Sequence, residues 1–457
     1  MTIQSAIDAL KPLLGHRLST SKPDLVVHGA NESYFDPAPP DAVAYPENTA
    51  DVQAIMRVCS EHGCPVIPWG VGTSLEGHAI AIRGGISVDF TKMNKVIAVN
   101  TEDMDCIVQP GVTRRALDTE LRATGLFFSV DPGADATLGG MAATRASGTT
   151  AVRYGTMRDN VLGLEVVLAD GRAIRTGTRA RKSSAGYDLT ALFVGSEGTL
   201  GLITELTVKL RGQPEAASSA VCAFPGITEA VEAVIATIQM GIPMARIEFV
   251  DAEVTKAFNA YAKSDLPAQP HLMIEFHGSE DSVREDAEKF GSVAAEFGAR
   301  GFQWSSKAED RTRLWRMRHD AFWAIMSRHP GRRAVTTDVC VPISRLAEAV
   351  TAAHKDITAS GLYGPLVGHV GDGNFHATIV VDPDAPEDLQ RAKDLAHRMT
   401  ERALAMSGTA TGEHGVGIGK MAYMEAEHGD AWQVMGELKR TLDPKNVLNP
   451  GKVVRGN

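Results

Sequence analysis

Hydrophobic and polar residues follow two different periods along this chain. An apolar residue returns every three or four positions in three stretches, and this spacing predicts helices over residues 3–14, 51–62 and 114–124. β-Branched and other apolar residues form short runs that predict strands within residues 64–69, 85–90, 105–112, 163–176 and 201–210. The dipeptide Asp170-Gly171 favours a tight turn, so we expect the run at 163–176 to form a hairpin.

A second pattern begins after a polar break that contains proline, Arg211-Gly-Gln-Pro-Glu. Beyond this break, strand-like residues at 220–224 and 272–276 each lead into a stretch with helical spacing. The stretches with helical spacing lie at residues 228–240, 283–297, 345–360 and 387–407. The doubled order of strand and helix predicts a ferredoxin-like α+β domain with its helices on one side of the sheet.

Composition narrows the class of protein. The chain has 457 residues, which predicts two or three domains. It carries 46 basic and 56 acidic residues without a block of Lys or Arg, which argues against a nucleic-acid partner and a polybasic membrane surface. Five cysteines without a C-x-x-C pair argue against a disulfide framework and an iron–sulfur cluster. No apolar run reaches the ~18 residues of a transmembrane segment, so we expect a cytoplasmic protein, with peripheral membrane association as the alternative.

The distribution of glycine is the most informative feature of the composition. The 44 glycines concentrate at residues 63–201 and 361–419, which indicates binding sites built from loops. In the loop PWGVGTSLEGH at 68–78, backbone N–H groups can converge on a phosphate. Its spacing does not match the Rossmann motif, and taken alone the loop fits an ordinary glycine-rich turn somewhat better than a phosphate site. The segment GIGK at 417–420 does not match a Walker loop, because Met421 follows it in place of Ser or Thr. Two further stretches of small residues, 131–149 and 182–205, would let the backbone lie flat against a large planar ligand. Together the three loops predict one extended ligand.

These loops carry a resemblance to a known family. The segments PWGVGTSLEGH, PGADATLGGM and FVGSEGTLGLITE resemble the FAD domain of the vanillyl-alcohol-oxidase type of flavoenzymes. HVGDGNFH, TGEHGVG and LNPGK resemble the D-2-hydroxy-acid dehydrogenase branch of that superfamily. With TTDVCVPISRL at 336–346, the chain from about residue 42 onward resembles the cytochrome-linked D-lactate dehydrogenases.

The resemblance implies an α+β fold with a particular domain order. We expect an N-terminal helical segment at 1–41 and an FAD-binding domain of two subdomains at 42–213. A ferredoxin-like substrate domain with a metal site is expected at 214–424, and a C-terminal segment that packs on the FAD domain at 425–457.

The resemblance also implies which residues line FAD. They are Gly70, Gly72, Thr73, Ser74, Pro132, Thr137, Gly139, Gly140, Ser147, Gly148, Glu197, Gly198, Ile203 and Asn449. Relatives that bind flavin covalently have a histidine directly after the paired glycines of the first loop, where this chain has Thr73. We therefore expect non-covalent FAD, while His78, five residues further on, keeps a covalent link open.

The densest set of chemical groups runs from His369 to His376 and continues at Glu413-His414. Two glycines between the first two histidines disfavour a helix, so we expect two strand ends joined by a turn, with both imidazoles facing one point. With the Glu413 carboxylate they would form a three-ligand site with room for water or substrate, as is typical of catalytic zinc or manganese. The alternative is that each histidine only satisfies backbone groups of the core.

Two more residues are candidates for direct contact with the substrate. A neutral imidazole at His414 suits a general base for an alcohol proton, although a surface histidine in a glycine-rich turn is the alternative. Arg318 fits the LW-x-x-R pattern of the family, which implies a guanidinium that grips the substrate carboxylate, with Arg313 and Arg316 as competing choices. Relatives that act on D-2-hydroxyglutarate carry a lysine near the position of Thr336, and its absence disfavours a second carboxylate.

The predicted function is oxidation of a small D-2-hydroxy acid, D-lactate first, with hydride transfer to flavin N5. Because no second redox centre is encoded, we expect electrons to pass to cytochrome c, the quinone pool or an electron-transfer protein. The alternatives are the flavin subunit of a glycolate dehydrogenase complex, a D-2-hydroxyglutarate dehydrogenase and, from a different class, a flavin-free metallohydrolase. The sequence leaves open the exact acid, the metal and the oligomeric state, a homodimer included.

Overall fold

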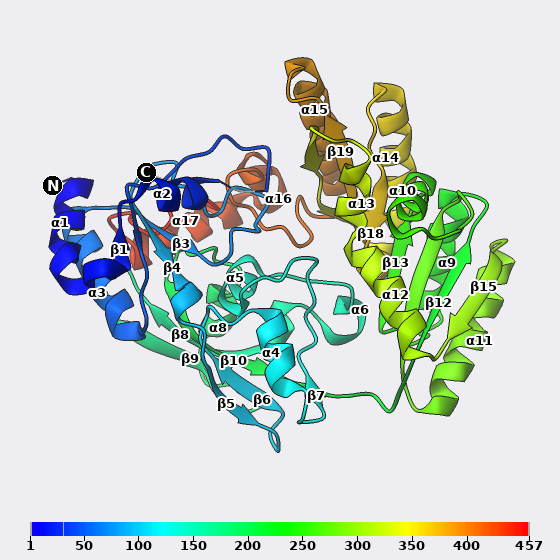
Figure 1. Ribbon diagram of the computed structural model, residues 1–457, viewed down its shortest axis with the longest axis horizontal. Helices are drawn as coiled ribbons and strands as arrows, with labels where there is room; N and C mark the ends of the chain where they lie inside the picture. The colour runs from blue at the N-terminus through cyan, green and yellow to red at the C-terminus, as the bar shows by residue number, and fades with distance from the viewer. Residues whose placement is uncertain (1, 31, 456–457) are drawn as a thin grey trace. The chain divides into compact units, whose positions relative to one another are not determined.

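The computed structural model describes residues 2–30 and 32–455. The chain forms two compact units, each built from several stretches of sequence (Figure 1). Unit 1 comprises residues 1–147, 155–213 and 413–457, and unit 2 comprises residues 148–154 and 214–412. One unit boundary lies between residues 213 and 214, where a domain limit was predicted, whereas no unit ends at 41 or 424. The division into four parts stays a prediction. Among the described helices, none is both long and apolar enough to cross a lipid bilayer.

The first sheet of unit 1 has the strand order β1-β2-β4-β3, with β2 and β3 both parallel to β4. Its strands are β1 (Leu18–Ser19), β2 (Ala42–Ala44), β3 (Val66–Trp69) and β4 (Ile86–Asp89). Ile7 of α1 (Ile3–Leu14) and Ile55 of α3 (Thr49–His62) share a core with Ile86 of β4. α3 starts where the side chain of Asn48 accepts a hydrogen bond from the Asp51 N–H, and it ends at Gly63, whose φ is 63°. The predicted helices at 3–14 and 51–62 are therefore confirmed.

The second sheet of unit 1 is antiparallel throughout, with the order β5-β6-β10-β8-β9. Its strands are β5 (Val96–Asn100), β6 (Asp105–Val108), β8 (Val161–Val167), β9 (Ala173–Gly177) and β10 (Leu202–Lys209). β8 and β9 form the hairpin predicted at 163–176, and Gly171 in their turn has a φ of 82°. A two-stranded ribbon of β7 (Leu126–Phe127) and β11 (Arg211–Gly212) completes the sheets of this unit.

Helices of 4 to 14 residues precede, connect or follow the strands of unit 1. Besides α1 and α3 they are α2 (Lys22–Gly29), α4 (Arg114–Leu121), α5 (Leu138–Thr144), α7 (Met157–Asn160), α8 (Leu189–Phe193), α16 (Met424–His428) and α17 (Asp430–Leu442). Thr137 caps α5, because its hydroxyl accepts a hydrogen bond from the N–H of Gly140. The glycines at the start of α5 therefore lie on an ordered helical turn.

Unit 2 is built on one antiparallel sheet with the order β15-β12-β14-β13-β18-β19-β16, and β17 pairs with β19. Its strands are β12 (Ala216–Ala223), β13 (Arg246–Val250), β14 (His271–Gly278), β15 (Arg300–Ser305), β16 (Arg333–Thr336), β17 (Val339–Cys340), β18 (Leu366–Gly368) and β19 (Asn374–Val381). Its helices are α6 (Ala151–Tyr154), α9 (Ile227–Gln239), α10 (Ala252–Ala262), α11 (Glu280–Glu296), α12 (Ala308–His319), α13 (Ala321–Ser327), α14 (Leu346–Ser360) and α15 (Pro386–Ala405).

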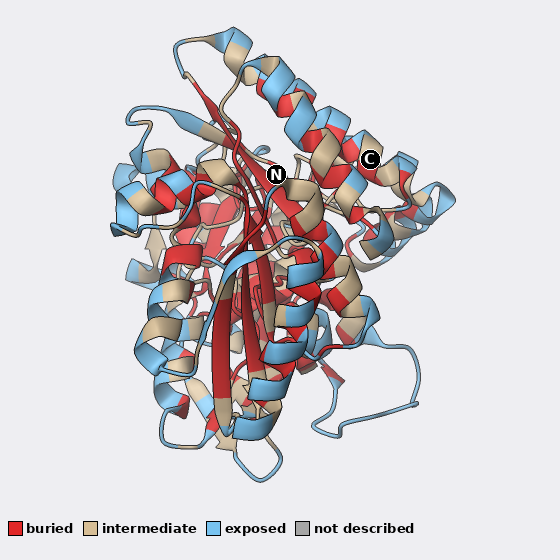
Figure 2. Ribbon diagram, turned by 90° about the vertical axis from the view of Figure 1, so that its right-hand side faces the viewer, coloured by how far each residue is buried: buried red, intermediate tan, exposed pale blue. Residues whose placement is uncertain are grey.

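Helices pack on both faces of the unit 2 sheet, which corrects the expectation of helices on one side. On one face, the ring of Phe276 in β14 contacts Phe290 of α11, with centroids 6.3 Å apart. On the other face, the neighbouring residue Glu275 accepts a hydrogen bond from the indole of Trp315 in α12. Figure 2 shows the central strands buried among helices whose outer surfaces are exposed. Strands covered on both faces lose the alternation of polar and apolar residues that would mark a single covered face.

Candidate active site

At several glycines in the loops of unit 1, neighbouring atoms lie so close that a side chain in place of the glycine would not fit. A Cβ on Gly70 would lie 2.4 Å from the hydroxyl oxygen of Thr137, and one on Gly198 would lie 2.2 Å from Cγ of Pro68. Gly72 has a φ of 74°, which L side chains rarely adopt, and a Cβ there would collide with the ring of Trp69. The backbone at 68–72, 137–140 and 197–198 therefore forms a closely packed surface that suits the flat approach of a ligand.

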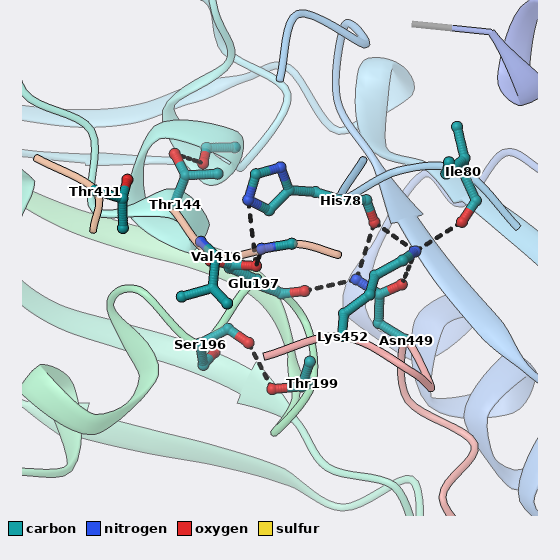
Figure 3. A network of polar contacts seen from close by, with 12 residues as sticks. His78, Ile80, Thr144, Ser196, Glu197, Thr199, Thr411, Val416, Asn449 and Lys452 are labelled. Atoms are coloured by element: carbon teal, nitrogen blue, oxygen red, sulfur yellow. Dashed lines mark hydrogen bonds and ion pairs between the residues drawn. The ribbon is translucent and has the colours of Figure 1, made fainter. Parts of the chain in front are cut away.

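Glu197 is the centre of a polar network behind this surface (Figure 3). Its buried carboxylate accepts hydrogen bonds from the N–H groups of Val416 (2.7 Å) and Gly417 (2.8 Å), and Nε2 of His78 lies 3.2 Å away. Burial alone would raise the pKa of Glu197, but His78 and the two N–H groups lower it below its ordinary value. Glu197 therefore stays ionised in the interior of unit 1.

Asn449 joins the end of the chain to the same network. Its side-chain N–H donates to the carbonyl oxygens of His78 (3.1 Å) and Glu197 (2.8 Å). Its backbone N–H donates to the carbonyl of Val66 in β3, and its φ is 41°. The segment that contains Asn449 therefore lies within unit 1, beside Glu197 and the strand that precedes the first glycine loop.

The other residues predicted to line FAD occupy less distinctive places. Thr137 and Ile203 are buried in unit 1, whereas Thr73, Ser74 and Pro132 are half-buried. Gly139 approaches Pro110 so closely that a Cβ would lie 2.5 Å from the proline ring. Ser147 closes one stretch of unit 1 and Gly148 opens a stretch of unit 2. The assignment of these residues to FAD stays a prediction.

In unit 2, a buried carboxylate connects two of the predicted site residues. Glu248 of β13 is fully buried, with Oε1 2.8 Å from Nδ1 of His369 and Oε2 2.6 Å from Nη2 of Arg318. Arg318 lies on α12 and is buried, whereas Arg313 and Arg316 on the same helix are exposed. Burial distinguishes Arg318 from its two competitors, and Glu248 supplies its counter-charge.

His369 and His376 lie at either end of the expected turn. His369 follows β18, His376 lies in β19, and the 3₁₀ helix η4 (Val370–Asp372) connects them through Gly373, whose φ is 81°. The prediction of two strand ends joined by a turn is confirmed. The two rings are nearly perpendicular, with centroids 5.6 Å apart, so the structure brings these two predicted ligands together.

Both histidines turn the same ring atom toward protein acceptors. Nδ1 of His369 faces Glu248, and Nδ1 of His376 lies 3.0 Å from the carbonyl oxygen of Thr337. Asp338, buried beside His376, accepts hydrogen bonds from Asn374 (2.7 Å) and Thr411 (2.7 Å). A metal-binding histidine commonly uses its second nitrogen in this way, which leaves Nε2 for the ion. The donor set in unit 2 is therefore compatible with a divalent metal.

Glu413 and His414 are the first two residues of the last stretch of unit 1, directly after Gly412 of unit 2. Both side chains are half-buried. Their assignment as the third metal ligand and the general base stays a prediction, as does the role of Arg318.

Sequence reasoning missed Glu248, Asp338 and Lys452. Glu248 and Asp338 are each an acid within an apolar or β-branched run, ARIEFV and AVTTDVCV, and a charge inside such a run is a usable signal for a buried functional group. Lys452, in LNPGKVV, had no comparable signal, because a lysine near the end of a chain is normally solvated.

Comparisons with known proteins show the family and the fold of this chain. Residues 40–177 match the family described as FAD binding domain, and residues 213–453 match FAD linked oxidases, C-terminal domain. Two solved structures share the fold at 17% identity: 4-ethylphenol oxidase from Gulosibacter chungangensis (TM-score 0.79, 99% of this chain and 97% of that chain) and p-cresol methylhydroxylase (TM-score 0.77, 98% and 96%). The expected α+β fold of the vanillyl-alcohol-oxidase type is therefore confirmed.

Curated relatives match over nearly the whole chain. The probable mitochondrial D-lactate dehydrogenase of Danio rerio is 49% identical over 93% of this chain and 87% of its own length. The mitochondrial D-lactate dehydrogenase [cytochrome] of Arabidopsis thaliana is 44% identical over 98% of this chain and 80% of its own length. Glycolate oxidase subunit GlcD of Bacillus subtilis is 36% identical, with 91% and 89% covered. The chain therefore belongs to the FAD-linked oxidases, in the flavoprotein family that contains the cytochrome-type D-lactate dehydrogenases.

Proposed function

We propose that this chain oxidises D-lactate to pyruvate, with FAD as the first electron acceptor and cytochrome c or a quinone-linked carrier as the second. The observation that carries the proposal is the identity of 49% and 44% to relatives named D-lactate dehydrogenase over more than nine-tenths of this chain. The buried Arg318 in unit 2 supports it, because a buried guanidinium suits a small carboxylate substrate.

The substrate carboxylate is assigned to Arg318. Glu248 neutralises this arginine through Nη2, and Nε is a buried donor without a hydrogen-bond partner among the described residues. A guanidinium has five N–H donors, so contact with Glu248 leaves others for a carboxylate. Because Glu248 also contacts His369, the same carboxylate orients both the arginine that binds the substrate and the first metal ligand.

His369, His376 and Glu413 would hold a divalent ion, zinc or manganese. When bound, the ion supplies a Lewis acid that lowers the pKa of the substrate hydroxyl. Glu248 and the carbonyl of Thr337 orient the two imidazoles through their Nδ1 atoms. His414 takes the hydroxyl proton as general base, and it is a better choice than the two metal ligands because their coordinating nitrogens have no lone pair left to accept a proton.

The glycine surface and the Glu197 network of unit 1 would hold FAD non-covalently. Bound FAD would supply the hydride acceptor for oxidation at C2 of the substrate. Acid precipitation of the purified protein should release the yellow colour into the supernatant. Colour retained in the pellet would instead support a covalent link, with His78 as the first residue to test.

Glycolate is the second candidate substrate, because the chain is 36% identical to a glycolate oxidase subunit over 91% of its length. An isolated chain that is inactive alone and becomes active with partner subunits would favour this alternative. The flavin-free metallohydrolase is no longer a candidate, because the chain matches an FAD-binding family.

The deciding experiment is the visible spectrum of the purified protein before and after anaerobic addition of D-lactate. We expect flavin absorbance that bleaches with D-lactate and is unchanged with L-lactate. Faster bleaching by glycolate than by D-lactate would assign the other substrate. Absorbance that no 2-hydroxy acid bleaches would reject the proposed reaction.

A further inference from the structure

In the described part of unit 1, two buried histidines each face a carboxylate, and the two pairs differ in one respect. His28 is satisfied at both nitrogens, with Nδ1 2.8 Å from the carbonyl oxygen of Asp24 and Nε2 2.9 Å from Asp89. His78 places Nε2 3.2 Å from Oε2 of Glu197 in an ion-pair contact, but neither of its ring nitrogens has a hydrogen-bond partner among the described residues. The His78 side chain is more than nine-tenths buried, with a relative exposure of 6%. A buried polar atom without a partner in the chain requires an explanation, and contact with a bound ligand is one.

The ring of His78 has little freedom to find another partner. A Cβ on Gly415 would lie 2.8 Å from Nε2 of His78 and 2.7 Å from Oε1 of Glu197, so backbone closes around this pair. The carbonyl oxygen of His78 accepts hydrogen bonds from both Asn449 (3.1 Å) and Lys452 (2.7 Å). Both the backbone and the ring of His78 are therefore held in place, as Figure 3 shows.

Lys452 is a buried cation with a matched set of acceptors. Its ammonium group donates to the carbonyl oxygens of His78 (2.7 Å) and Ile80 (2.7 Å) and to Oδ1 of Asn449 (2.6 Å). An ammonium has three N–H donors, and these three acceptors use all of them. Burial lowers the pKa of Lys452 to about 7, while Glu197 opposes this shift. This arrangement secures the segment 78–80 to the C-terminal segment at a cost in desolvation, which a plain surface lysine would not incur.

We propose that His78 is a flavin-contacting residue whose Nδ1 accepts a hydrogen bond from FAD, and that Glu197 and Lys452 are the residues that position it. The Glu197 carboxylate, 3.2 Å from Nε2, favours the ring proton on that nitrogen, which leaves the lone pair on Nδ1. An N–H or hydroxyl donor of FAD then supplies the partner that this atom lacks within the chain. The location fits, because His78 directly follows the glycine loop and touches Glu197 and Asn449, both assigned to FAD above. The inference rests on FAD binding alone and not on the identity of the substrate.

The test compares the two histidines by the same substitution. We expect His78→Gln to raise the dissociation constant of FAD at least about tenfold, the effect of one lost hydrogen bond at a buried site, and to shift the visible absorbance of the bound flavin. His28→Gln should lower the unfolding temperature and leave the affinity and the spectrum unchanged. The measurements are titration of apoprotein with FAD and the flavin spectrum, so a failure of D-lactate oxidation would not affect the result. Wild-type affinity and spectrum in His78→Gln, or equal changes in both variants, would overturn the proposal.

The positioning role of Lys452 has its own matched control. Lys439 is also buried and donates to the carbonyls of Thr199 and Leu448, but Asp443 supplies its counter-charge and it does not contact His78. Lys452→Met should release FAD at a lower urea concentration than the one that unfolds the protein, and Lys452→Arg should restore part of the affinity. In Lys439→Met, release and unfolding should coincide. If release and unfolding coincide in Lys452→Met as well, the lysine is only structural.

If His78→Gln does not fold, a measurement on the wild-type protein tests the contact between His78 and FAD. Exchange of the Cε1 hydrogen of each histidine can be followed by mass spectrometry on its own peptide. We expect this exchange to slow severalfold at His78 when FAD is added to the apoprotein and to stay constant at His28. An unchanged rate at His78 would overturn the proposal.

Discussion

Unit 1 and unit 2 each place a buried glutamate at the centre of a polar cluster, but they satisfy it in different ways. Glu197 of unit 1 accepts hydrogen bonds from the backbone N–H groups of Val416 and Gly417 and faces one histidine. Glu248 of unit 2 faces the side chains of Arg318 and His369. A cluster built on backbone suits the holding of a large cofactor, whereas one built on charged side chains suits the orientation of reacting groups. The comparison therefore predicts that substitutions at the unit 1 cluster impair cofactor binding, whereas substitutions at the unit 2 cluster impair the reaction.

Metal removal should have the largest effect that distinguishes the two units: loss of turnover without loss of FAD. We expect chelation to abolish turnover while FAD stays bound, because neutral imidazoles and a carboxylate release a divalent ion without disturbing the glycine surface. The measurement is turnover with D-lactate together with flavin absorbance and metal content. Restoration of turnover by zinc or manganese is the control. Activity that survives verified metal removal would reject the Lewis-acid role.

His414→Ala should slow flavin reduction by about 10²–10⁴-fold, because this is the usual contribution of one general base. FAD content should stay the same. Anaerobic stopped-flow reduction by D-lactate measures the rate, with L-lactate as the control. Reduction at the wild-type rate, with normal lactate binding, would assign the base to another group.

Glu248→Gln should lower metal affinity or activity by roughly 10–100-fold, the range for a residue that orients a metal ligand. The amide keeps the shape of the carboxylate but leaves the buried Arg318 without its counter-charge. Glu275→Gln is the matched control, because Glu275 is also buried in unit 2 and faces His277 and Trp315 instead. Competition for the metal by a chromophoric chelator gives the affinity. Equal losses in both variants would mean that Glu248 has no special role.

Arg318→Lys should raise the apparent KM for D-lactate by about tenfold, because lysine keeps the charge but loses the planar pair of donors. Arg316→Lys on the same helix is the control, since Arg316 is exposed and should leave KM unchanged. Steady-state kinetics measures both. A rise in KM of the same size in Arg316→Lys would reassign the carboxylate contact.

The smallest expected effect is a difference in acid sensitivity. The pKa of Glu197 lies below its ordinary value of 4.5, so its contribution to stability is complete above that pH and is lost as the pH falls through the lowered pKa. The fall of the unfolding temperature below about pH 4.5 should therefore be steeper in the wild type than in Glu197→Gln. Asp251 in unit 2 has the opposite sign, because burial raises its pKa to about 6 and its stabilisation declines as the pH rises from 3.8 toward 6. Thermal melts of Glu197→Gln and Asp251→Asn across this range measure both, and parallel curves would contradict the prediction.

Much of the local structure and one half of the site could be predicted from the sequence. The helix at 3–14 and the hairpin at 163–176 follow from hydrophobic spacing and an Asp-Gly turn, which depend on neighbouring residues alone. The glycine loops could be recognised because close backbone approach demands glycine at particular positions, such as Gly72 with its positive φ. The turn between His369 and His376 is local for the same reason.

Only the tertiary structure decided which distant groups meet. Glu248, Arg318 and His369 come from β13, α12 and the end of β18, and no short-range pattern links positions so far apart in the sequence. The same holds for Lys452, which reaches the carbonyl of His78 across 374 residues. The helices on both faces of the unit 2 sheet were also missed, because a strand buried on both sides shows a continuous apolar run and not the alternation of one covered face. Local patterns specify the backbone of this protein, whereas burial and the pairing of charges, which depend on the packed fold, specify which of its polar residues act together.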